Sequence, residues 1–419
     1  MDDIKRRVLV IAYHYPPLAG AGMLKILRTT RYLSDFGWDP LILTVKNPEP
    51  YHRADNPIPE SARVYRSWRI PGGNFLARIL RRLNLDERWL LLPDQYIFWI
   101  PGSLIYGWYL IIRQKVDLIY VTGPPYSALL CGALLKVLTG RPLVVDLRDP
   151  WSFNAARNGY PTKFHQWLDQ RLEKWVLKTA DFITCIYRIT QEGYGRLYPW
   201  TRVKTAIFYD TIDRGDLPEI VDSYAKFTIT YLGTFYPPFH TLKATLRAIR
   251  YLLDQGQITS DSFCFNYVGP FDKKFNSLIA ELNLAQIVRQ AGYQPLKEAQ
   301  VEIFKSHALL LLLEFATINT KLFDYLAAGK PILAVVPEFQ ELEELLQTYA
   351  SGFSMVSDGD YLKIAAIIVQ YHQEHYQGEL QVDPGKREHF IARMNIERET
   401  QELTAIFNQI IAEKKGLNV

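Results

Sequence analysis

Apolar and polar positions alternate along this chain in two different rhythms. Short runs rich in Val, Ile and Leu are followed by longer stretches in which apolar residues recur every three or four positions. This succession is typical of βαβ units, which build parallel sheets. For the first half it predicts strands at 8–13, 40–45, 117–122, 142–147 and 181–187, and helices at 21–36, 101–114, 126–139 and 163–179.

A polar segment, YDTIDRGDLPEIVDSYAK at 209–226, interrupts the rhythm and is expected to be a linker. The pattern restarts with KFTITYLGTF, a strand that runs into Gly233. We then expect strands at 262–268, 287–292, 307–315 and 352–356, and helices at 241–254, 272–282, 296–306, 339–348, 359–373 and 386–413. The chain is thus predicted to be two doubly wound α/β domains in series, with ligands at the carboxyl ends of the strands.

Length and composition agree with this organisation. A chain of 419 residues is too long for one ordinary core, and 48% hydrophobic with 22% charged residues excludes a disordered protein. The net charge of +4 is too mild for a typical nucleic-acid binder but is compatible with an anionic small ligand. Three widely separated cysteines and the start MDDIKRR, which has no secretory pattern, favour a cytoplasmic location.

Two neighbouring segments suggest contact with a membrane. The apolar segment 89–112 is interrupted by proline, glycine and polar residues, so we do not expect it to span a bilayer. The stretch before it, FLARILRRLNLDERWLLL at 75–92, predicts an amphipathic basic helix. Its apolar residues are Leu76, Ile79, Leu80 and Leu83, and its basic residues are Arg78, Arg81, Arg82 and Arg88. This pattern favours peripheral contact with an anionic bilayer, although an ordinary surface helix has the same pattern.

The bend Gly20-Ala21-Gly22 lies between the first strand and the first helix. Glycine lets the backbone approach a ligand closely, and the amino end of a helix favours an anion. A plain strand-to-helix turn explains these glycines equally well. In the following helix, residues with the spacing of Met23 and Ile26 should pack on the sheet, which leaves Lys25 and Arg28 on the other side.

Charged residues also gather at predicted strand ends. VVDLRDPW at 144–151 places Asp146, Arg148 and Asp149 at the end of a buried strand, where open α/β sheets present functional groups. Such a cluster needs partners or a ligand, because an unpaired buried charge is costly. His14 and Tyr15 occupy the same end of the first strand, although a single histidine is more often structural.

The stretch FATINTKLFDYLAAGKPILAVVP, residues 315–337, predicts a helix that Asn319 or Thr320 caps and that Gly329 ends. Asp324 lies near the start of this helix, where its carboxylate could accept hydrogen bonds from a diol such as a ribose. A surface pair between Lys321 and Asp324 is the simpler local interpretation.

These motifs together resemble a known family. YHYPPLAGAGMLKILRTTRYLSDFGWDPLILT, VTGPPYSALL, PLVVDLRDPW and TKLFDYLAAGKPILAV, in this order, are similar to the retaining glycosyltransferases of family 4. The branch concerned contains enzymes of cell-wall, capsule and lipopolysaccharide biosynthesis. The similarity extends through nearly the whole chain.

The resemblance implies a GT-B fold, with two Rossmann-like doubly wound domains that face each other across a cleft. Residues 1–210 would form the acceptor-side domain and residues 211–385 the domain that binds a nucleotide-sugar. Residues 386–419 would form a C-terminal helix that packs back on the first domain. A cofactor or metal is not expected, because cationic side chains and amides neutralise the leaving diphosphate in such enzymes.

The resemblance also implies roles for individual residues. The carboxylate of Asp324 would hold the ribose hydroxyls of the donor. The remaining donor contacts would be Gly20, Ala21, Gly22, Gly233, His240 and Lys321. Arg148, Asp149 and Lys243 would be catalytic, and His14 and Tyr15 would contact the acceptor.

The chain departs from the family pattern at two places. The family usually has two glutamates eight positions apart, whereas this chain has Ala316 and Asp324. Basic residues usually follow the first strand of the second domain, and here only His240 and Lys243 are present.

The leading hypothesis is transfer of a hexose from a nucleotide-diphosphate sugar to a lipid-linked or polysaccharide acceptor. The alternatives are a non-catalytic protein that binds sugar nucleotides and a nucleotide-sugar epimerase that uses Asp146 or Asp149 as acid and base.

Overall fold

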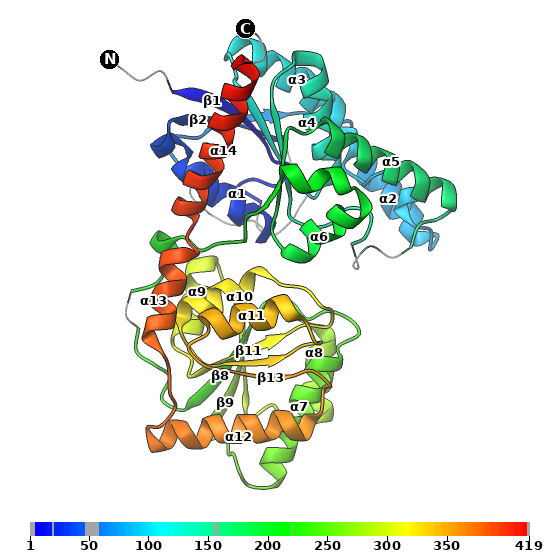
Figure 1. Ribbon diagram of the computed structural model, residues 1–419. Helices are drawn as coiled ribbons and strands as arrows, with labels where there is room; N and C mark the ends of the chain where they lie inside the picture. The colour runs from blue at the N-terminus through cyan, green and yellow to red at the C-terminus, as the bar shows by residue number, and fades with distance from the viewer. Residues whose placement is uncertain are drawn as a thin grey trace. The chain divides into compact units, whose positions relative to one another are not determined.

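The computed structural model describes residues 5–18, 21–46, 58–154, 157, 159–219 and 221–416. These residues form two compact units, one from residues 1–211 with 396–419 and the other from residues 212–395. Each unit is built around one sheet in which all neighbouring strands are parallel. This arrangement confirms the predicted α/β class (Figure 1).

The first unit contains a seven-stranded sheet of order β3-β2-β1-β4-β5-β6-β7. Leu9 of the first strand pairs with Leu41 and Ile119 of its two neighbours. The strands are β1 (Arg6–Ile11), β2 (Trp38–Val45), β3 (Arg63–Ser67), β4 (Leu118–Gly123), β5 (Leu143–Leu147), β6 (Phe182–Cys185) and β7 (Thr205–Ile207). The α-helices are α1 (Ala21–Tyr32), α2 (Gly73–Arg82), α3 (Ile100–Arg113), α4 (Tyr126–Thr139), α5 (Lys163–Thr179), α6 (Arg188–Leu197) and α14 (Ile396–Gly416).

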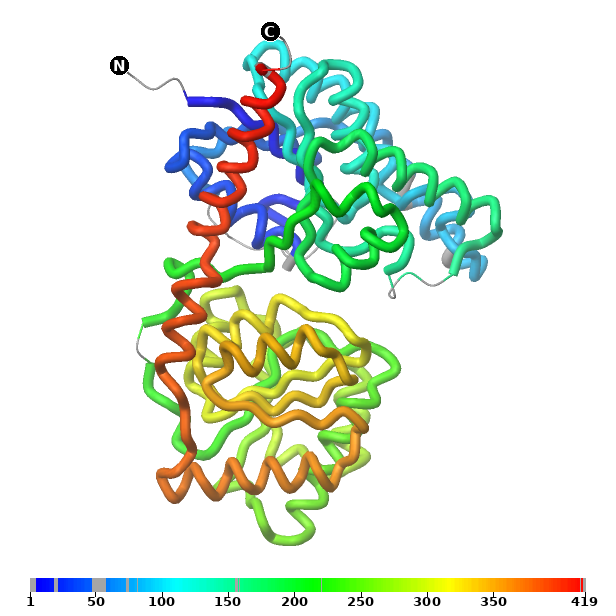
Figure 2. Tube along the Cα trace, viewed as in Figure 1, coloured from blue at the N-terminus to red at the C-terminus, as the bar shows by residue number. Residues whose placement is uncertain are grey.

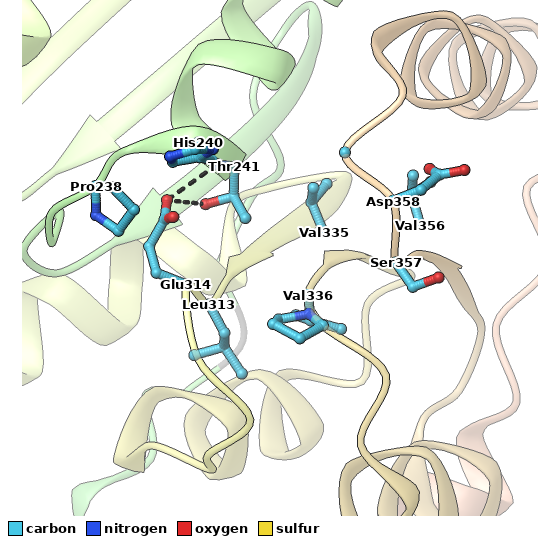
Figure 3. Close-up of a pocket in the computed structure, with 12 residues that line it drawn as sticks. Pro238, His240, Thr241, Leu313, Glu314, Val335, Val336, Val356, Ser357 and Asp358 are labelled. Atoms are coloured by element: carbon cyan, nitrogen blue, oxygen red, sulfur yellow. Dashed lines mark hydrogen bonds between the residues drawn. The ribbon is translucent and has the colours of Figure 1, made fainter. Parts of the chain in front are cut away.

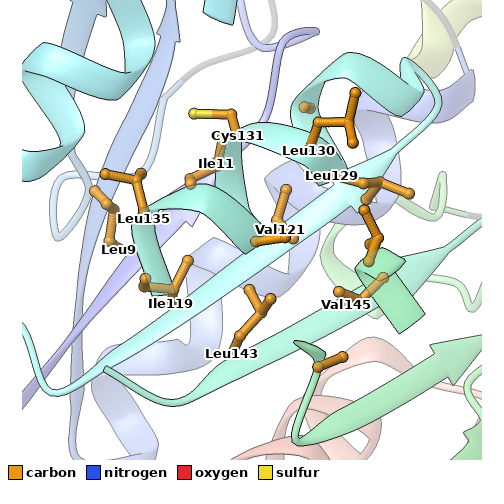
Figure 4. Close-up of a cluster of buried hydrophobic side chains, with 14 of the residues drawn as sticks. Leu9, Ile11, Ile119, Val121, Leu129, Leu130, Cys131, Leu135, Leu143 and Val145 are labelled. Carbon is orange, nitrogen blue, oxygen red and sulfur yellow. The ribbon is translucent and has the colours of Figure 1, made fainter. Parts of the chain in front are cut away.

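Alternate residues of these strands face two separate cores, because successive side chains of a strand point to opposite faces. Leu9 and Ile11 of β1 pack with α4 on one face (Figure 4). Val8 and Val10 pack on the other face with α1 and with Phe407 of α14. Figure 2 shows α14 (red) running beside α1 (blue), so this face is covered by segments that lie far apart in the sequence.

The second unit contains a six-stranded sheet of order β10-β9-β8-β11-β12-β13. Its strands are β8 (Phe227–Leu232), β9 (Phe263–Val268), β10 (Val288–Gly292), β11 (Ala308–Leu312), β12 (Ile332–Val335) and β13 (Phe353–Val356). Its α-helices are α7 (His240–Asp254), α8 (Lys273–Glu281), α9 (Leu296–Phe304), α10 (Thr320–Ala328), α11 (Gln340–Tyr349), α12 (Tyr361–Gln377) and α13 (Pro384–Arg393).

The C-terminal segment differs from the expectation of one helix at 386–413 that packs on the first domain. It forms α13 and α14, which are separated at Met394 and Asn395, and α13 belongs to the second unit. Phe390 of α13 is fully buried near Phe323 and Tyr349. Because α13 has this apolar contact of its own, only residues from 396 onward belong to the first unit.

The sequence pattern missed four elements, namely β3, β7, β12 and α6. The strands β3 and β7 lie at the edges of the first sheet and have only five and three residues, and β12 has only four, too few for a clear alternation. In the described part of the chain, no helix combines the length and apolarity needed to cross a membrane.

Candidate functional site

Arg148 and Gly22 meet at the amino end of α1. The backbone N–H of Arg148, which follows β5, donates to Gly123 O at 2.9 Å, and Nη2 donates to Pro124 O at 2.6 Å. A Cβ placed on Gly22 would lie only 1.7 Å from Nη1 of Arg148. Glycine is therefore required at position 22 if the guanidinium is to reach the first turn of α1.

The site around Arg148 has unused hydrogen-bonding capacity. Nε of Arg148 is buried and has no hydrogen-bond partner among the described residues. A guanidinium beside the amino end of a helix is suited to an anion or to an oxygen-rich ligand. Gly20 lies outside the described residues, and the same holds for the side chain of Ala21, whose backbone begins α1.

The carboxylates of the same strand end differ in their surroundings. Asp146 is fully buried, and its two oxygens accept from Thr122 Oγ1 at 2.8 Å and Thr184 Oγ1 at 2.7 Å. Burial raises the pKa of Asp149, and the positive charge of Arg148 opposes this effect. Asp146 is therefore part of a polar network inside the unit, whereas Asp149 remains a candidate for a role in the site.

Lys25 and Arg28, which were predicted on the side of α1 away from the sheet-facing residues, are buried. Lys25 Nζ donates to Phe208 O at 2.6 Å and lies 3.6 Å from Asp146 and 3.4 Å from Glu399. They are buried because α14 covers this face of α1 and brings the carboxylate of Glu399 with it. Nothing in the local pattern of α1 indicates an ion-pair partner more than 370 residues further along the chain.

The two predicted acceptor residues lie in different environments. His14 is half-buried against the rings of Tyr13 and Tyr96, and burial followed by the charge of Arg148 lowers its pKa to about 4. Tyr15 is fully buried, and its hydroxyl lies 3.0 Å from Thr30 Oγ1. The side chain of Tyr15 is thus packed in the hydrophobic core, which corrects the expectation that it contacts an acceptor.

A cavity of about 480 Å³ opens in the first unit beside the end of β4. Its lining combines an aromatic ring with amide, carboxylate and guanidinium groups, including Glu87, Tyr126, Asn154 and Arg157. The guanidinium carbon of Arg157 lies 4.9 Å from the ring centroid of Tyr126. Planar polar groups beside an aromatic ring suit the hydroxyls and apolar face of a sugar. Sequence reasoning missed this cavity, because its residues come from separate loops.

In the second unit, Lys321 lies over the end of β8. Its ammonium donates to the hydroxyl of Tyr231 at 2.8 Å and lies 4.1 Å from the centroid of that ring. Gly233 follows β8 with φ +114°, and a Cβ placed on it would lie 3.2 Å from Lys321 Nζ. Two predicted donor residues are therefore neighbours.

Asp324 is 7% exposed, so it is a buried residue and does not form the surface pair with Lys321 that the sequence allowed. Its Oδ1 lies 3.5 Å from Nε2 of Gln300 in α9. The amide oxygen of Gln300 is buried and has no partner among the described residues. Gln300 therefore offers an unused hydrogen-bond acceptor beside the predicted ribose-binding carboxylate. Gln300 was not among the predicted residues, and the only hint in the sequence was a polar residue among the apolar residues of α9.

His240, the first residue of α7, lines a cavity of about 330 Å³ at the carboxyl ends of β11, β12 and β13. Glu314 accepts from the backbone N–H of Thr241 at 3.0 Å and from its hydroxyl at 2.8 Å across one side of this cavity (Figure 3). Lys321, Asp324 and Lys243 do not belong to its lining. Of the predicted donor residues that the structure describes, His240 alone belongs to the lining of this cavity.

The predicted amphipathic helix corresponds to α2, with one correction. Arg88 lies beyond the helix and is buried, where it pairs with Asp86 and donates to Gly159 O at 2.5 Å. It cannot contact a bilayer as expected. Exposed residues of α2, of the turn after it and of the start of α5 instead form a surface that we call the α2–α5 patch. It comprises Phe75, Arg78, Arg82, Leu83, Leu85, Trp89, Leu90, Lys163, Phe164, Trp167 and Arg171.

The two parts of the α2–α5 patch are in contact. The rings of Trp89 and His165 lie 5.1 Å apart, and Arg171 packs over the ring of Trp167. The patch is apolar and basic, which is the character of surfaces that bind anionic lipid.

Comparisons with known proteins agree with this architecture. Residues 9–208 match the family model of a glycosyl transferase 4-like domain. No curated protein matches the sequence significantly. Sucrose-phosphate synthase from Thermosynechococcus elongatus is similar in structure, with a TM-score of 0.72 and 14% identity over 97% of this chain and 100% of that chain.

Two further solved structures have the same architecture. HepE from Anabaena, in complex with UDP, has a TM-score of 0.64 and 14% identity over 96% of this chain and 100% of that chain. A structure described as a UDP-N-acetylglucosamine 2-epimerase from Listeria monocytogenes has a TM-score of 0.57 and 10% identity over 98% and 97%. Residues 9–208 are therefore similar to a glycosyl transferase 4-like domain, and the chain as a whole has the GT-B fold of two Rossmann-like units.

Proposed function

We propose that this protein is a retaining glycosyltransferase of cell-envelope polysaccharide biosynthesis. It would move a hexose from a nucleotide-diphosphate sugar to a lipid-linked or polysaccharide acceptor. The observation that carries the proposal is the contact of Arg148 with Gly22 at the amino end of α1, inside the glycosyl transferase 4-like domain. This guanidinium, with its buried Nε lacking a partner in the described residues, suits an anionic or oxygen-rich substrate group.

The second unit would hold the nucleotide. Asp324 and the amide oxygen of Gln300 are hydrogen-bond acceptors, which suits the two hydroxyls of a ribose. Gly233 permits close approach of a ligand to the end of β8. The bound UDP of HepE supports a nucleoside diphosphate as the ligand class. We expect no metal requirement, because cationic side chains would meet the diphosphate charge.

The first unit would hold the acceptor. The cavity beside Tyr126 and Asn154 suits a sugar, and Leu85, Asp86 and Glu87 of its lining belong to the segment that also contributes to the α2–α5 patch. An acceptor sugar in this cavity would therefore lie next to a surface suited to lipid. We accordingly propose that the protein works on a lipid-linked acceptor at the inner face of the cytoplasmic membrane.

An epimerase is the second candidate, because a structure described as an epimerase shares the fold. An epimerase needs an acid and a base beside the sugar. The carboxylate of Asp146 is engaged by two threonine hydroxyls inside the sheet and is unsuited to that task, so of the two predicted carboxylates only Asp149 suits it.

A panel of UDP, GDP, ADP and their sugars, followed by thermal unfolding, tests the ligand class. A ligand at 100 times its Kd should stabilise the protein by about 2.7 kcal/mol. Absence of stabilisation by every member would contradict the proposed function.

A further inference from the structure

Lys321 is a cation in an electrostatically unfavourable place. Within the described residues its ammonium forms no ion pair, and its hydrogen bond goes to the neutral hydroxyl of Tyr231. That hydroxyl itself donates to Thr234 O at 2.8 Å, so its orientation is fixed. Lys321 also lies in the first turn of α10, where the helix dipole disfavours positive charge. The fold therefore holds an amine at this point whose positive charge no described residue compensates.

The surroundings of this ammonium are suited to an anion. Asn319 precedes α10 but makes no capping hydrogen bond through its side chain, and its Oδ1 has no partner among the described residues. The amino end of α10 and the ammonium thus lie beside Gly233, where a side chain would fill the space. Backbone amides, a cation and a glycine in one place favour phosphate oxygens.

The loop after β8 does not supply a comparable cation. Its two basic candidates are on α7, where His240 lines the cavity near Glu314 and Lys243 lies one turn further along. Neither residue lies in the space over Gly233 that Lys321 occupies.

We propose that Lys321 is the cation that neutralises the donor's diphosphate, in place of basic residues in the loop after β8. This inference rests on the proposed function, because it names the residue that meets the diphosphate of the nucleotide. It predicts that Lys321 distinguishes a nucleoside diphosphate from its nucleoside.

Burial lowers the pKa of Lys321 to about 7, which gives the assignment a measurable consequence. An anion bound beside the ammonium raises that pKa again, so binding above neutral pH should take up a proton. The other titratable side chains in this region are Tyr231, Tyr236, Tyr267, Glu314, Asp324 and Tyr325. Burial raises the pKa of Tyr231 and Tyr325 well above neutral, so neither phenol exchanges a proton there.

The test is titration calorimetry of the full chain with whichever of UDP, GDP and ADP binds most tightly, and with its parent nucleoside. Lys321→Gln should weaken diphosphate binding about tenfold or more and leave nucleoside binding unchanged. Lys330→Gln is the matched control, because Lys330 follows the other end of α10 and should change neither affinity. Equal diphosphate affinity of wild type and Lys321→Gln would overturn the inference and leave the proposed function standing.

Proton uptake gives a second readout that needs no variant. Wild-type protein titrated at pH 8 in buffers of different ionisation enthalpy should take up a proton with the diphosphate but not with the nucleoside. Binding of the diphosphate without proton uptake would contradict the assignment even if Lys321→Gln failed to fold. Wild-type protein that binds none of the three diphosphates would reject the proposed function together with the inference.

Discussion

The guanidinium of Arg148 occupies the space that a side chain at residue 22 would need, with Nη1 only 1.7 Å from the position of a Cβ on Gly22. Two motifs separated by more than 120 residues thus form one feature at the amino end of α1. The local sequence explained Gly22 equally well as a turn residue. The contact gives it a specific purpose, because any side chain there displaces Arg148.

Gly22→Ala should therefore reduce activity far more than stability. The clashing atoms belong to the far end of a flexible side chain, which can move away, so we expect a loss of only about 1 kcal/mol. Displacement of Arg148 should lower kcat/KM for the nucleotide-sugar at least about tenfold.

Gly132→Ala provides the contrast for this prediction. Its Cβ would lie 2.8 Å from Val121 Cγ1 in the core, so we expect about 1–3 kcal/mol of destabilisation. Urea unfolding and steady-state kinetics of both variants check the pair. Full activity in a folded Gly22→Ala protein would show that Arg148 has no part in the reaction.

Asp324→Asn should remove recognition of the ribose. The carboxylate accepts hydrogen bonds better than the amide, so we expect about a tenfold loss of affinity for the diphosphate nucleotide that wild type binds. Wild type should bind the 2′,3′-dideoxy analogue of that nucleotide about as weakly as the variant binds either ligand. Calorimetry of both proteins with both ligands gives four affinities. If the affinity lost through the variant and the affinity lost through the analogue simply add, Asp324 does not bind the ribose hydroxyls and the proposed role is wrong.

Charge reversal in the α2–α5 patch should release the protein from membranes. Arg78, Arg82 and Arg171 are exposed members of this patch, and each basic residue near an anionic surface contributes about 1 kcal/mol. The triple glutamate variant should therefore no longer sediment with vesicles that contain phosphatidylglycerol, while it still binds nucleotide.

A control variant carries the same charge change on the second unit, with Arg247, Lys273 and Lys363 replaced by glutamate. This control should sediment like wild type, and added salt should release wild type from the vesicles. Equal sedimentation of the patch variant and the control would count against the patch. Wild-type protein that survives a high-salt wash would argue against electrostatic attachment.

Acid should destabilise the second unit through His307. Its Nδ1 accepts from Thr228 N–H at 3.1 Å, and burial followed by the charge of His375 lowers its pKa to about 4. Because the folded pKa lies below the unfolded value of 6.5, the contribution to stability is complete above pH 6.5 and is lost as the pH falls through 4.

Partial exposure of His307 limits the effect to about 1 kcal/mol between pH 7 and pH 5. His307→Asn keeps an acceptor oxygen and cannot titrate, so it should reduce this pH dependence in urea unfolding. The exposed His389→Asn should leave it unchanged. A pH profile of His307→Asn identical to that of wild type would contradict this origin.

The sequence predicted the sheets well because their strands are buried on both faces. Leu9 and Val10 of β1 are both core residues on opposite faces, so the apolar run is continuous and easily recognised. The position of Arg148 and Asp149 at a strand end also followed from local patterning. These features depend on neighbours that are close in sequence.

Features that depend on distant neighbours were not predictable in the same way. Lys25 lies on the polar side of α1, and this side is buried because α14 packs against it and places Glu399 beside Lys25. Lys321 and Asp324 have the spacing of a surface pair. In the structure, however, Lys321 donates a hydrogen bond to Tyr231 of β8, and Gln300 of α9 lies beside Asp324. The candidate site was therefore predicted as a set of strand ends and helix starts, without its partners.

The most direct test of the proposed activity is proton NMR of the protein incubated with a nucleotide-sugar that it binds. We predict release of the free nucleoside diphosphate, with the sugar first appearing as the anomer that the donor carried. This release should be at least about tenfold slower in Gly22→Ala. A changed sugar that is still attached to the nucleotide would instead identify an epimerase, and binding without any reaction in the presence of lipid extract would contradict a transferase.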